Sequence, residues 1–368
     1  MRRTFILCVV MCVLSLSAAA QSAPESATLV LSQPVEREIA GREQHSYHLN
    51  LAAGQFARVS VEQRLIDVVL ILTSPEGRQL PEINFTDAGE AELLSIDPAS
   101  AGVYSLTVRG IGGSKMRGSY RLQAVAQTPT DSSKSYAAAQ TLVLDASQLA
   151  KEGPSGIVQA IEKLEQAMPV WQRLGERTWM GLTLYQIGRM QMRQGRPDKA
   201  QGTFEQAVAV HRDLKERLRE AASLNGLANA YYNQRQFEKA IEIFEQELSI
   251  FREQKFRRWE GLILNSLGNT NANLGRLEKA IEYFEQSRAI MQEVNDQTNE
   301  AQAMNRIGVM NLNRGKTDES VASFRSAIAK YKEAEDRFGE AQTLNNLAIA
   351  ENRVGRSAFE AGFGLGCS

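Results

Sequence analysis

A spacing of 40 residues governs the C-terminal part of the chain and limits its fold more than any other feature. Glutamate recurs at this interval, at Glu220, Glu260, Glu300 and Glu340. The same interval relates Ala200, Ala240 and Ala280, with Ser320 in the next place, and Phe204, Phe244, Phe284 and Phe324. Glycine or alanine follows it at Gly188, Ala228, Gly268, Gly308 and Ala348. So regular a repetition predicts an all-α superhelical solenoid, in which stacked units bury a shared core.

Each unit is predicted to be a pair of helices, here called helix A and helix B. Helix A carries leucines and a small residue, as at Leu224, Leu227 and Ala228, and helix B carries Ala240 and Phe244. Small residues let neighbouring helices approach closely, and the phenylalanine ring fills the space between them.

The turns between the helices carry signals of their own. Gly195, Gly275 and Gly315 stand between helix A and helix B, where a left-handed residue suits the end of a helix. Pro197 is expected to open a helix B, because the first turn of a helix tolerates proline.

These residues resemble the signature of the tetratricopeptide repeat (TPR) family, over about residues 140–356. The usual TPR period is about 34 residues, and HEAT or armadillo repeats have longer periods, but the spacing of the small residues favours TPR. The longer period resembles the extended-helix repeats related to kinesin light chains. The predicted units are 137–179 (degenerate), 180–219, 220–259, 260–299, 300–339 and a half repeat at 340–356, followed by an irregular tail at 357–368.

The N-terminal part has the signals of strands instead. Between residues 27 and 126, apolar and polar residues alternate in short runs that glycine and proline interrupt, which predicts an antiparallel β-sandwich. The stretches YHLNLAAGQFARVSV, DVVLILTSPEG and GVYSLTVRG resemble the PPC-like domains of exported bacterial proteins. The polar segment 127–136 is predicted to be a linker.

The first 20 residues are predicted to be a secretory signal peptide. Arg2 and Arg3 precede an apolar run of about a dozen residues and then small residues. The alternative is a membrane anchor, but the run is short for a span. Cys8 and Cys12 would leave with the peptide, so only Cys367 remains. The mature protein is expected in the periplasm or outside the cell, and the sequence leaves these two places open.

Asparagines recur every four residues on the predicted A helices. Asn is a poor helix former, at roughly 0.6 kcal/mol against Ala, so their number needs a reason. They are Asn225, Asn229, Asn233, Asn265, Asn269, Asn273, Asn305, Asn313 and Asn345. A spacing of four places them on one face of each helix, and the TPR resemblance implies that this face lines the concave groove. The first unit has Arg189 and Arg193 at two of the corresponding positions.

This stripe is predicted to bind a protein or peptide. An amide offers donors and an acceptor, so a row of amides can hold a peptide backbone. Arg189 and Arg193 could select an acidic group or a C-terminal carboxylate. The alternatives are a structural ladder whose amides bond water or one another, a small ligand, and an intramolecular partner.

No catalytic site, metal site or cofactor is predicted, because no motif for one occurs. His45 and His48 are expected on opposite faces of a strand, and His211 at the surface of a helix B. The charged residues of 238–247 are expected on a solvated face. The formal net charge of −1 gives no reason to expect a nucleic-acid partner.

The repeat pattern stops half-way through a unit, since Glu360 and Gly364 replace the small residue and the phenylalanine. The chain is either a natural short form or truncated near Arg356. The first functional hypothesis is a non-enzymatic exported scaffold. The order of domains also resembles the front part of TPR–CHAT proteins, which implies substrate recruitment for a caspase-like cysteine protease whose catalytic domain is not in this sequence. Carbohydrate or envelope binding by the sandwich is a third possibility. The oligomeric state is left open.

Overall fold

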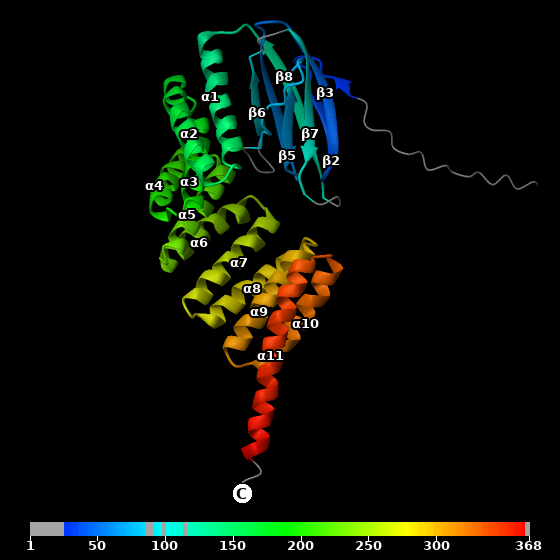
Figure 1. Ribbon diagram of the computed structural model, residues 1–368, viewed down its shortest axis with the longest axis vertical. Coiled ribbons are helices and arrows are strands. Elements are labelled where there is room, and N and C mark those ends of the chain that lie inside the picture. Colours follow the sequence, from blue (N-terminus) through cyan, green and yellow to red (C-terminus); the bar gives the residue numbers. More distant parts are fainter. Residues whose placement is uncertain (1–25, 85–90, 98–100, 113–115, 365–368) are drawn as a thin grey trace, which may run out of the picture. The chain divides into compact units, whose positions relative to one another are not determined.

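The structure of the chain, a computed structural model, describes residues 26–84, 91–97, 101–112 and 116–364, with side chains as far as Val354. The predicted signal peptide and the three cysteines lie outside these residues. The chain divides into two compact units, residues 1–93 with 98–128 and residues 94–97 with 129–368. Strands make up the first unit and helices dominate the second (Figure 1).

The strands form two four-stranded sheets, which confirms the predicted β-sandwich. The strands are β1 (Ala27–Thr28), β2 (Val35–Ala40), β3 (Gln44–Leu51), β4 (Phe56–Arg64), β5 (Val68–Thr73), β6 (Ala91–Ile96), β7 (Gly102–Gly110) and β8 (Arg117–Gln127). One sheet has the order β1-β3-β7-β5 and the other β2-β8-β4-β6. Strand β7 pairs antiparallel with β3 and β5, and β8 with β2 and β4, whereas β1 pairs parallel with β3.

Alternation along each strand sends one set of side chains into the core between the sheets. In β3, Tyr47 and Leu49 are buried, as the period of two predicts. The hydroxyl of Tyr47 lies 2.5 Å from that of Tyr120 on β8, so a buried hydrogen bond joins the two sheets. His45 Nδ1 lies 2.7 Å from the same Tyr120 oxygen, and His48 falls on the other face of β3, as predicted.

The helical unit contains eleven helices among the described residues. They are α1 (Asp131–Leu149), α2 (Pro154–Leu174), α3 (Arg177–Arg193), α4 (Pro197–Asp213), α5 (Arg217–Asn233), α6 (Phe237–Glu253), α7 (Arg257–Asn273), α8 (Leu277–Glu293), α9 (Gln297–Asn313), α10 (Thr317–Glu333) and α11 (Arg337–Gly364). Consecutive helices pack in pairs, with α3, α5, α7 and α9 as A helices and α4, α6, α8 and α10 as B helices. None of the described helices is both long enough and apolar enough to cross a bilayer.

The turns between these helices contain a left-handed residue every 20 positions. Between A and B, Gly195, Gly275 and Gly315 have φ of 69°, 73° and 75°, as predicted. Between B and A, Gly175 takes the left-handed position before α3, and non-glycine residues such as Lys215 and Lys255 take it in the later turns. Each A helix begins three residues before the predicted start of its unit, and after α3 no glycine marks the turn that precedes it.

Phenylalanine rings fill the space between A and B helices, as the repeat predicts. Phe284 on α8 is completely buried, and a Cβ atom added to Gly268 of α7 would lie 2.5 Å from its ring. Phe324 and Gly308 repeat this contact in the next pair, at 2.6 Å. A larger side chain at either glycine would have to displace the ring.

Three of the four recurring glutamates, Glu220, Glu260 and Glu300, are buried, and all four are ion-paired near the joints between units. Glu220 at the start of α5 accepts from Arg212 Nε at 2.7 Å and from Arg217 Nη1 at 2.6 Å. Arg217 also reaches Glu253 at the end of α6, at 2.8 Å. The carboxyl of Glu220 therefore ties α4, α5 and α6 together, and Glu260 makes the corresponding contacts 40 residues later.

Two predicted irregular segments are more ordered than expected. Only residues 128–130 lie between β8 and α1, because Thr130 and Ser133 form a capping box in which each side chain accepts from the other's backbone N–H. The prediction of an irregular tail at 357–368 was wrong for residues 357–364, because α11 continues through them without a break. Adding a residue to an existing helix avoids the cost of nucleation, which offsets the poor propensity of glycine.

His211 is buried rather than at the surface, so this prediction was wrong. Its side chain is 1% exposed, and Nδ1 lies 3.0 Å from Ser223 Oγ. The corresponding residues of other B helices are large and buried, at Trp171, Phe251, Met291 and Tyr331. The ring therefore takes a packing position, and its burial lowers the pKa of His211 to about 4.

Replacing Phe284 with alanine tests the ring packing. The loss of a fully buried ring should lower the free energy of unfolding by about 3–5 kcal/mol. The matched control is Phe338→Ala, because Phe338 is 82% exposed and its loss should change that free energy by less than about 0.5 kcal/mol. Denaturant unfolding followed by circular dichroism measures both, and equal effects would contradict the packing role.

Candidate functional site

The asparagines of α5 lie on one face, as their spacing predicts. Asn229 Nδ2 donates to Asn225 Oδ1 at 2.9 Å and to the Asn225 carbonyl at 2.8 Å. Asn233 Nδ2 donates in the same way to the Asn229 carbonyl, at 2.8 Å. Asn229 and Asn233 are thus each held by the residue four positions earlier, and the three side chains form a continuous row.

The row continues from one A helix to the next. Asn273 Nδ2 on α7 donates to the Tyr232 hydroxyl on α5, at 2.8 Å. Asn265 Nδ2 on α7 donates to Gln302 Oε1 on α9, also at 2.8 Å. Asn346 Nδ2 on α11 donates to Asn305 Oδ1 on α9, at 3.0 Å. These hydrogen bonds connect Asn265, Asn273 and Asn305 with neighbouring A helices. The surface formed by the asparagines at the repeat positions of α5, α7, α9 and α11 is here called the amide stripe.

Exposure divides the amide stripe into two parts. The asparagines nearest the C-terminal ends of their helices are exposed, namely Asn233, Asn273 and Asn313, together with Asn345 on α11. Those one or two turns earlier, Asn225, Asn229, Asn265 and Asn269, are half-buried, and Asn305 is 6% exposed. Asn305 was predicted to contact a ligand, but the neighbouring Asn346 covers it and uses its oxygen.

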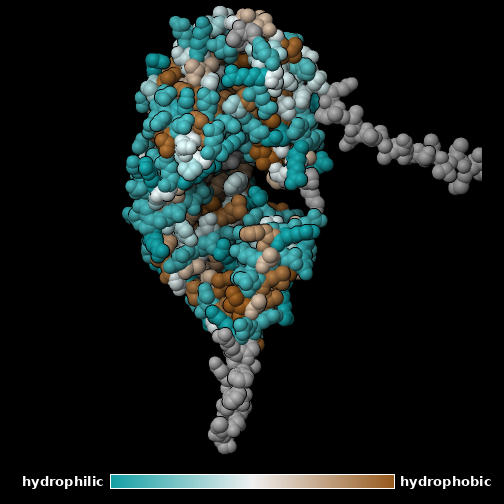
Figure 2. All heavy atoms as spheres, viewed as in Figure 1, coloured by the Kyte–Doolittle hydropathy of each residue, from teal (hydrophilic) through white to brown (hydrophobic). Residues whose placement is uncertain are grey.

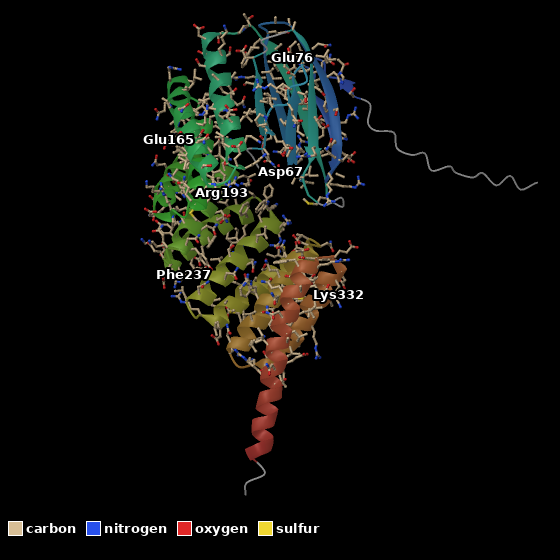
Figure 3. The ribbon with its side chains drawn as sticks, viewed as in Figure 1. Asp67, Glu76, Glu165, Arg193, Phe237 and Lys332 are labelled. Atoms are coloured by element: carbon tan, nitrogen blue, oxygen red, sulfur yellow. The ribbon has the colours of Figure 1, made fainter. Side chains whose placement is uncertain are left out.

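Two arginines occupy the corresponding face of α3. Arg189 and Arg193 are both exposed, and Figure 3 shows Arg193 at the end of this helix. The guanidinium of Arg189 lies 5.7 Å from the centre of the Tyr185 ring, a cation–π contact that leaves its N–H groups free to bond elsewhere. The amide stripe thus ends in positive charge on α3.

Glu247 lies beneath the amide stripe and was wrongly expected on a solvated face. Its side chain on α6 is buried, and one carboxyl oxygen accepts from Asn225 Nδ2 at 3.2 Å. Burial raises the pKa of Glu247 to about 8, and the Asn225 hydrogen bond only partly opposes this effect. In other units small residues stand at this position, at Ala207, Ser287 and Ala327.

The sequence did not predict every residue of the amide stripe. Tyr232, Gln302 and Asn346 each complete a bond between A helices, but none belongs to the repeated asparagine positions. Glu247 could have been found from the sequence, since a glutamate stands there at a repeat position that small residues occupy in other units.

Two other features have the composition of a site, but one is inaccessible and the charges of the other partly neutralise one another. His211 and Ser223 resemble a base and a nucleophile, but both are buried, with Ser223 completely so. On the sandwich, a surface pocket of about 190 Å³ is lined by Arg37, Arg64, Arg121, Glu36 and Glu38 among others. Arg121 Nε lies 3.8 Å from a Glu36 oxygen, so these charges partly neutralise one another. The described residues hold no group of three or more histidines, cysteines and carboxylates that suits a metal ion.

Replacing Glu247 with glutamine should remove a dependence of stability on pH. Between pH 4.5 and about 8 the folded state binds a proton that the unfolded state releases, so stability falls as pH rises through this window. At pH 8.5, Glu247→Gln should be more stable than the natural chain by a few kcal/mol, and the two should converge near pH 4.5. Unfolding midpoints across this range measure the effect. The control is Glu242→Gln, an exposed change on the same helix, and an identical pH profile for all three chains would contradict the assignment.

Comparison with known proteins identifies the repeats. The family model described as tetratricopeptide repeat matches residues 179–253, 219–293 and 259–333. No curated protein matches the chain.

Several solved structures are similar to the helical part. Aspartyl phosphate phosphatase F from Bacillus subtilis has a TM-score of 0.55 and 16% identity, covering 64% of this chain and 61% of that one. A STAND protein with a tetratricopeptide repeat sensor from Pyrococcus horikoshii has a TM-score of 0.51 and 13% identity, covering 58% and 32%. A kinesin light chain with TPR-like repeats from Podosopora anserina has a TM-score of 0.47 and 19% identity, covering 54% and 96%. The first two of these structures share the fold of the helical part. Residues 179–333 therefore consist of tetratricopeptide repeats, as the sequence predicted.

Proposed function

We propose that this chain is a scaffold that binds a protein or peptide along the amide stripe. The observation that carries the proposal is the row of exposed side chains at one position of successive A helices, Arg193, Asn233, Asn273 and Asn313. Each asparagine in this row keeps an amide oxygen that accepts, and an extended backbone offers an N–H at regular intervals.

The dimensions of the row suit an extended segment. Packed neighbouring helices lie roughly 8–10 Å apart, so three intervals span roughly 24–30 Å. An extended chain advances about 3.3 Å per residue, so a bound segment of about eight residues would cover the row.

The hydrogen bonds within the amide stripe also support binding. They hold the amides in fixed orientations before a partner arrives, which lowers the entropy cost of binding. Arg189 and Arg193 give the row a direction, because a carboxylate of the partner would be stabilised at the α3 end. We expect the scaffold itself to be non-enzymatic, and its partner to be a protein or peptide and not a nucleic acid.

The row is tested by the triple variant Asn233→Ala, Asn273→Ala and Asn313→Ala. A partner is first captured with the full chain, and its affinity is then measured by calorimetry. The triple variant should lose at least tenfold in affinity, whereas its helix content should stay, because alanine is the better helix former.

The matched control changes three exposed amides of the B helices at the same 40-residue interval, Gln206, Gln246 and Gln286, to alanine. The control should bind like the natural chain. Unchanged binding by the asparagine variant, or an equal loss in the control, would refute the proposal.

We also propose that the chain is exported and that its sandwich is PPC-like. The basic start, apolar run and small residues of the first 20 positions support export, and the strand motifs support the domain type. Expression in a bacterial host followed by fractionation and N-terminal sequencing tests export. The mature protein should begin at Gln21 and lie outside the cytoplasm. An intact Met1 on protein recovered from the cytoplasm would contradict export.

A further inference from the structure

Three connections between strands meet at one end of the β-sandwich. Their described residues, here called the loop end, are 41–43 between β2 and β3, 65–67 between β4 and β5, and 111, 112 and 116 between β7 and β8. Gly41 N donates to the Met116 carbonyl at 3.0 Å, and Ile111 N donates to the Asp67 carbonyl at 2.8 Å. Figure 3 shows Asp67 at this end of the sandwich and Glu76 at the opposite end. Backbone hydrogen bonds thus hold the loop end together as one surface.

Three apolar side chains of the loop end face away from the core. Leu65 is 81% exposed, Met116 40% and Ile111 36%. Ile66, which follows Leu65, is completely buried against Gly118, so the side chain of Leu65 is held outside the core. Figure 2 shows hydrophobic side chains among hydrophilic ones at this end of the sandwich. The loop end therefore presents separate apolar side chains on its loops.

The backbone of Leu65 is strained for a leucine. Its φ of 64° lies in the left-handed region, which glycine adopts freely and bulky side chains rarely do. The exposed side chain gains little packing in return. Strained conformations of this kind concentrate at functional sites, where the surrounding structure holds them. Folding alone would favour glycine at this position, so the leucine points to a role outside the fold.

Three arginines surround these apolar side chains. Arg64 directly precedes Leu65, Arg117 directly follows Met116, and Arg42 lies between β2 and β3. All three are exposed, and none of them forms an ion pair with another described residue, although Arg64 also borders the pocket described above. A guanidinium presents a fork of N–H groups that matches the oxygens of a phosphate. The arginines are therefore suited to phosphate groups arranged around an apolar insertion.

The two carboxylates of the loop end already have partners within the sandwich. Glu43 Oε2 accepts from Ala40 N at 2.7 Å, and Glu43 Oε1 lies 3.2 Å from His45 Nε2. Asp67 Oδ2 accepts from Asn84 Nδ2 at 3.2 Å. These contacts engage both carboxylates, so the three arginines remain able to bind an anion from outside.

We propose that the loop end docks on a membrane surface that contains anionic phospholipid. Leu65, Ile111 and Met116 enter the apolar region beneath the headgroups, and the three arginines bind the phosphate groups around them. Lipid accommodates single side chains, whereas a protein partner would need a matching surface for each of them. Apolar burial and attraction to anionic lipid add together in docking of this kind. The hydrogen bonds among the loops fix the side chains before docking, which lowers its entropy cost.

This docking surface is separate from the amide stripe. It lies on the sandwich and shares no residue with the asparagines of the A helices. Docking therefore does not depend on the proposed function, and a chain that lacks a peptide partner should still bind lipid.

Sedimentation with vesicles tests the docking. The chain is used from Gln21 onward, so that the apolar run of the first 20 residues cannot itself bind lipid. It should bind vesicles of equal parts phosphatidylglycerol and phosphatidylcholine at least tenfold more tightly than vesicles of phosphatidylcholine alone. Leu65→Glu should lower the affinity for the mixed vesicles at least tenfold. The matched control is Val103→Glu, which should bind like the natural chain, because Val103 is 46% exposed but lies at the opposite end of β7.

Leu65→Gly separates docking from folding. Glycine adopts the left-handed conformation without strain, so this variant should keep or raise the melting temperature. It should nevertheless bind the mixed vesicles more weakly, because the apolar side chain is gone. A melting temperature that falls together with the affinity would assign Leu65 a structural role and overturn the proposal.

Arg42→Gln tests the contribution of charge. It should weaken binding to the mixed vesicles about fivefold. Its control is Arg78→Gln, an exposed arginine two residues from Glu76 at the opposite end, which should have no effect. Equal binding to both kinds of vesicle, no binding to either, or an equal loss in a control would overturn the proposal. So would self-association without vesicles that Leu65→Glu abolishes, because it would assign the loop end to a second copy of the chain.

Discussion

Each joint between an A and a B helix rests on a ring that fits only where a neighbouring side chain is small. Phe284 against Gly268 and Phe324 against Gly308 are the clearest cases. This fit sets the distance between each B helix and its A helix, and it recurs at the corresponding position of every pair. The A helices consequently lie side by side in a constant register, and that register aligns the asparagines into one stripe.

The sequence predicted this packing well because the residues that make it repeat. The period showed the helix pairs, the rings and the small residues, and the spacing of four placed the asparagines of α5 on one face. Unit boundaries were less accurate, since Lys215 and Lys255 adopt left-handed turns that their residue type does not signal. Burial within the amide stripe was also missed. Asn305 of α9 offers no free oxygen to the surface, because its Oδ1 accepts from Asn346 of α11, a contact that no local pattern contains.

Exceptions to the repeat explain the other errors. His211 takes the position that Trp171 and Phe251 fill in other units. It is buried because of this position in the repeat, although its side chain is polar. Glu247 likewise occupies a position reserved for small residues, so its carboxyl is forced between helices. In both cases polarity suggested a surface residue, and alignment with the neighbouring units would have given the buried position.

The buried carboxylates at the joints have a consequence for how the array responds to heat. Glu220 is almost fully removed from water and is balanced by Arg212 on the preceding helix α4 and by Arg217 on its own helix. The desolvation penalty of such ion clusters falls as temperature rises, whereas apolar stabilisation per unit area levels off. Warming therefore raises the contribution of the ion pairs at the junctions between units relative to that of the apolar packing within each unit. The junctions between units would then stay intact at temperatures at which the packing within the units has weakened.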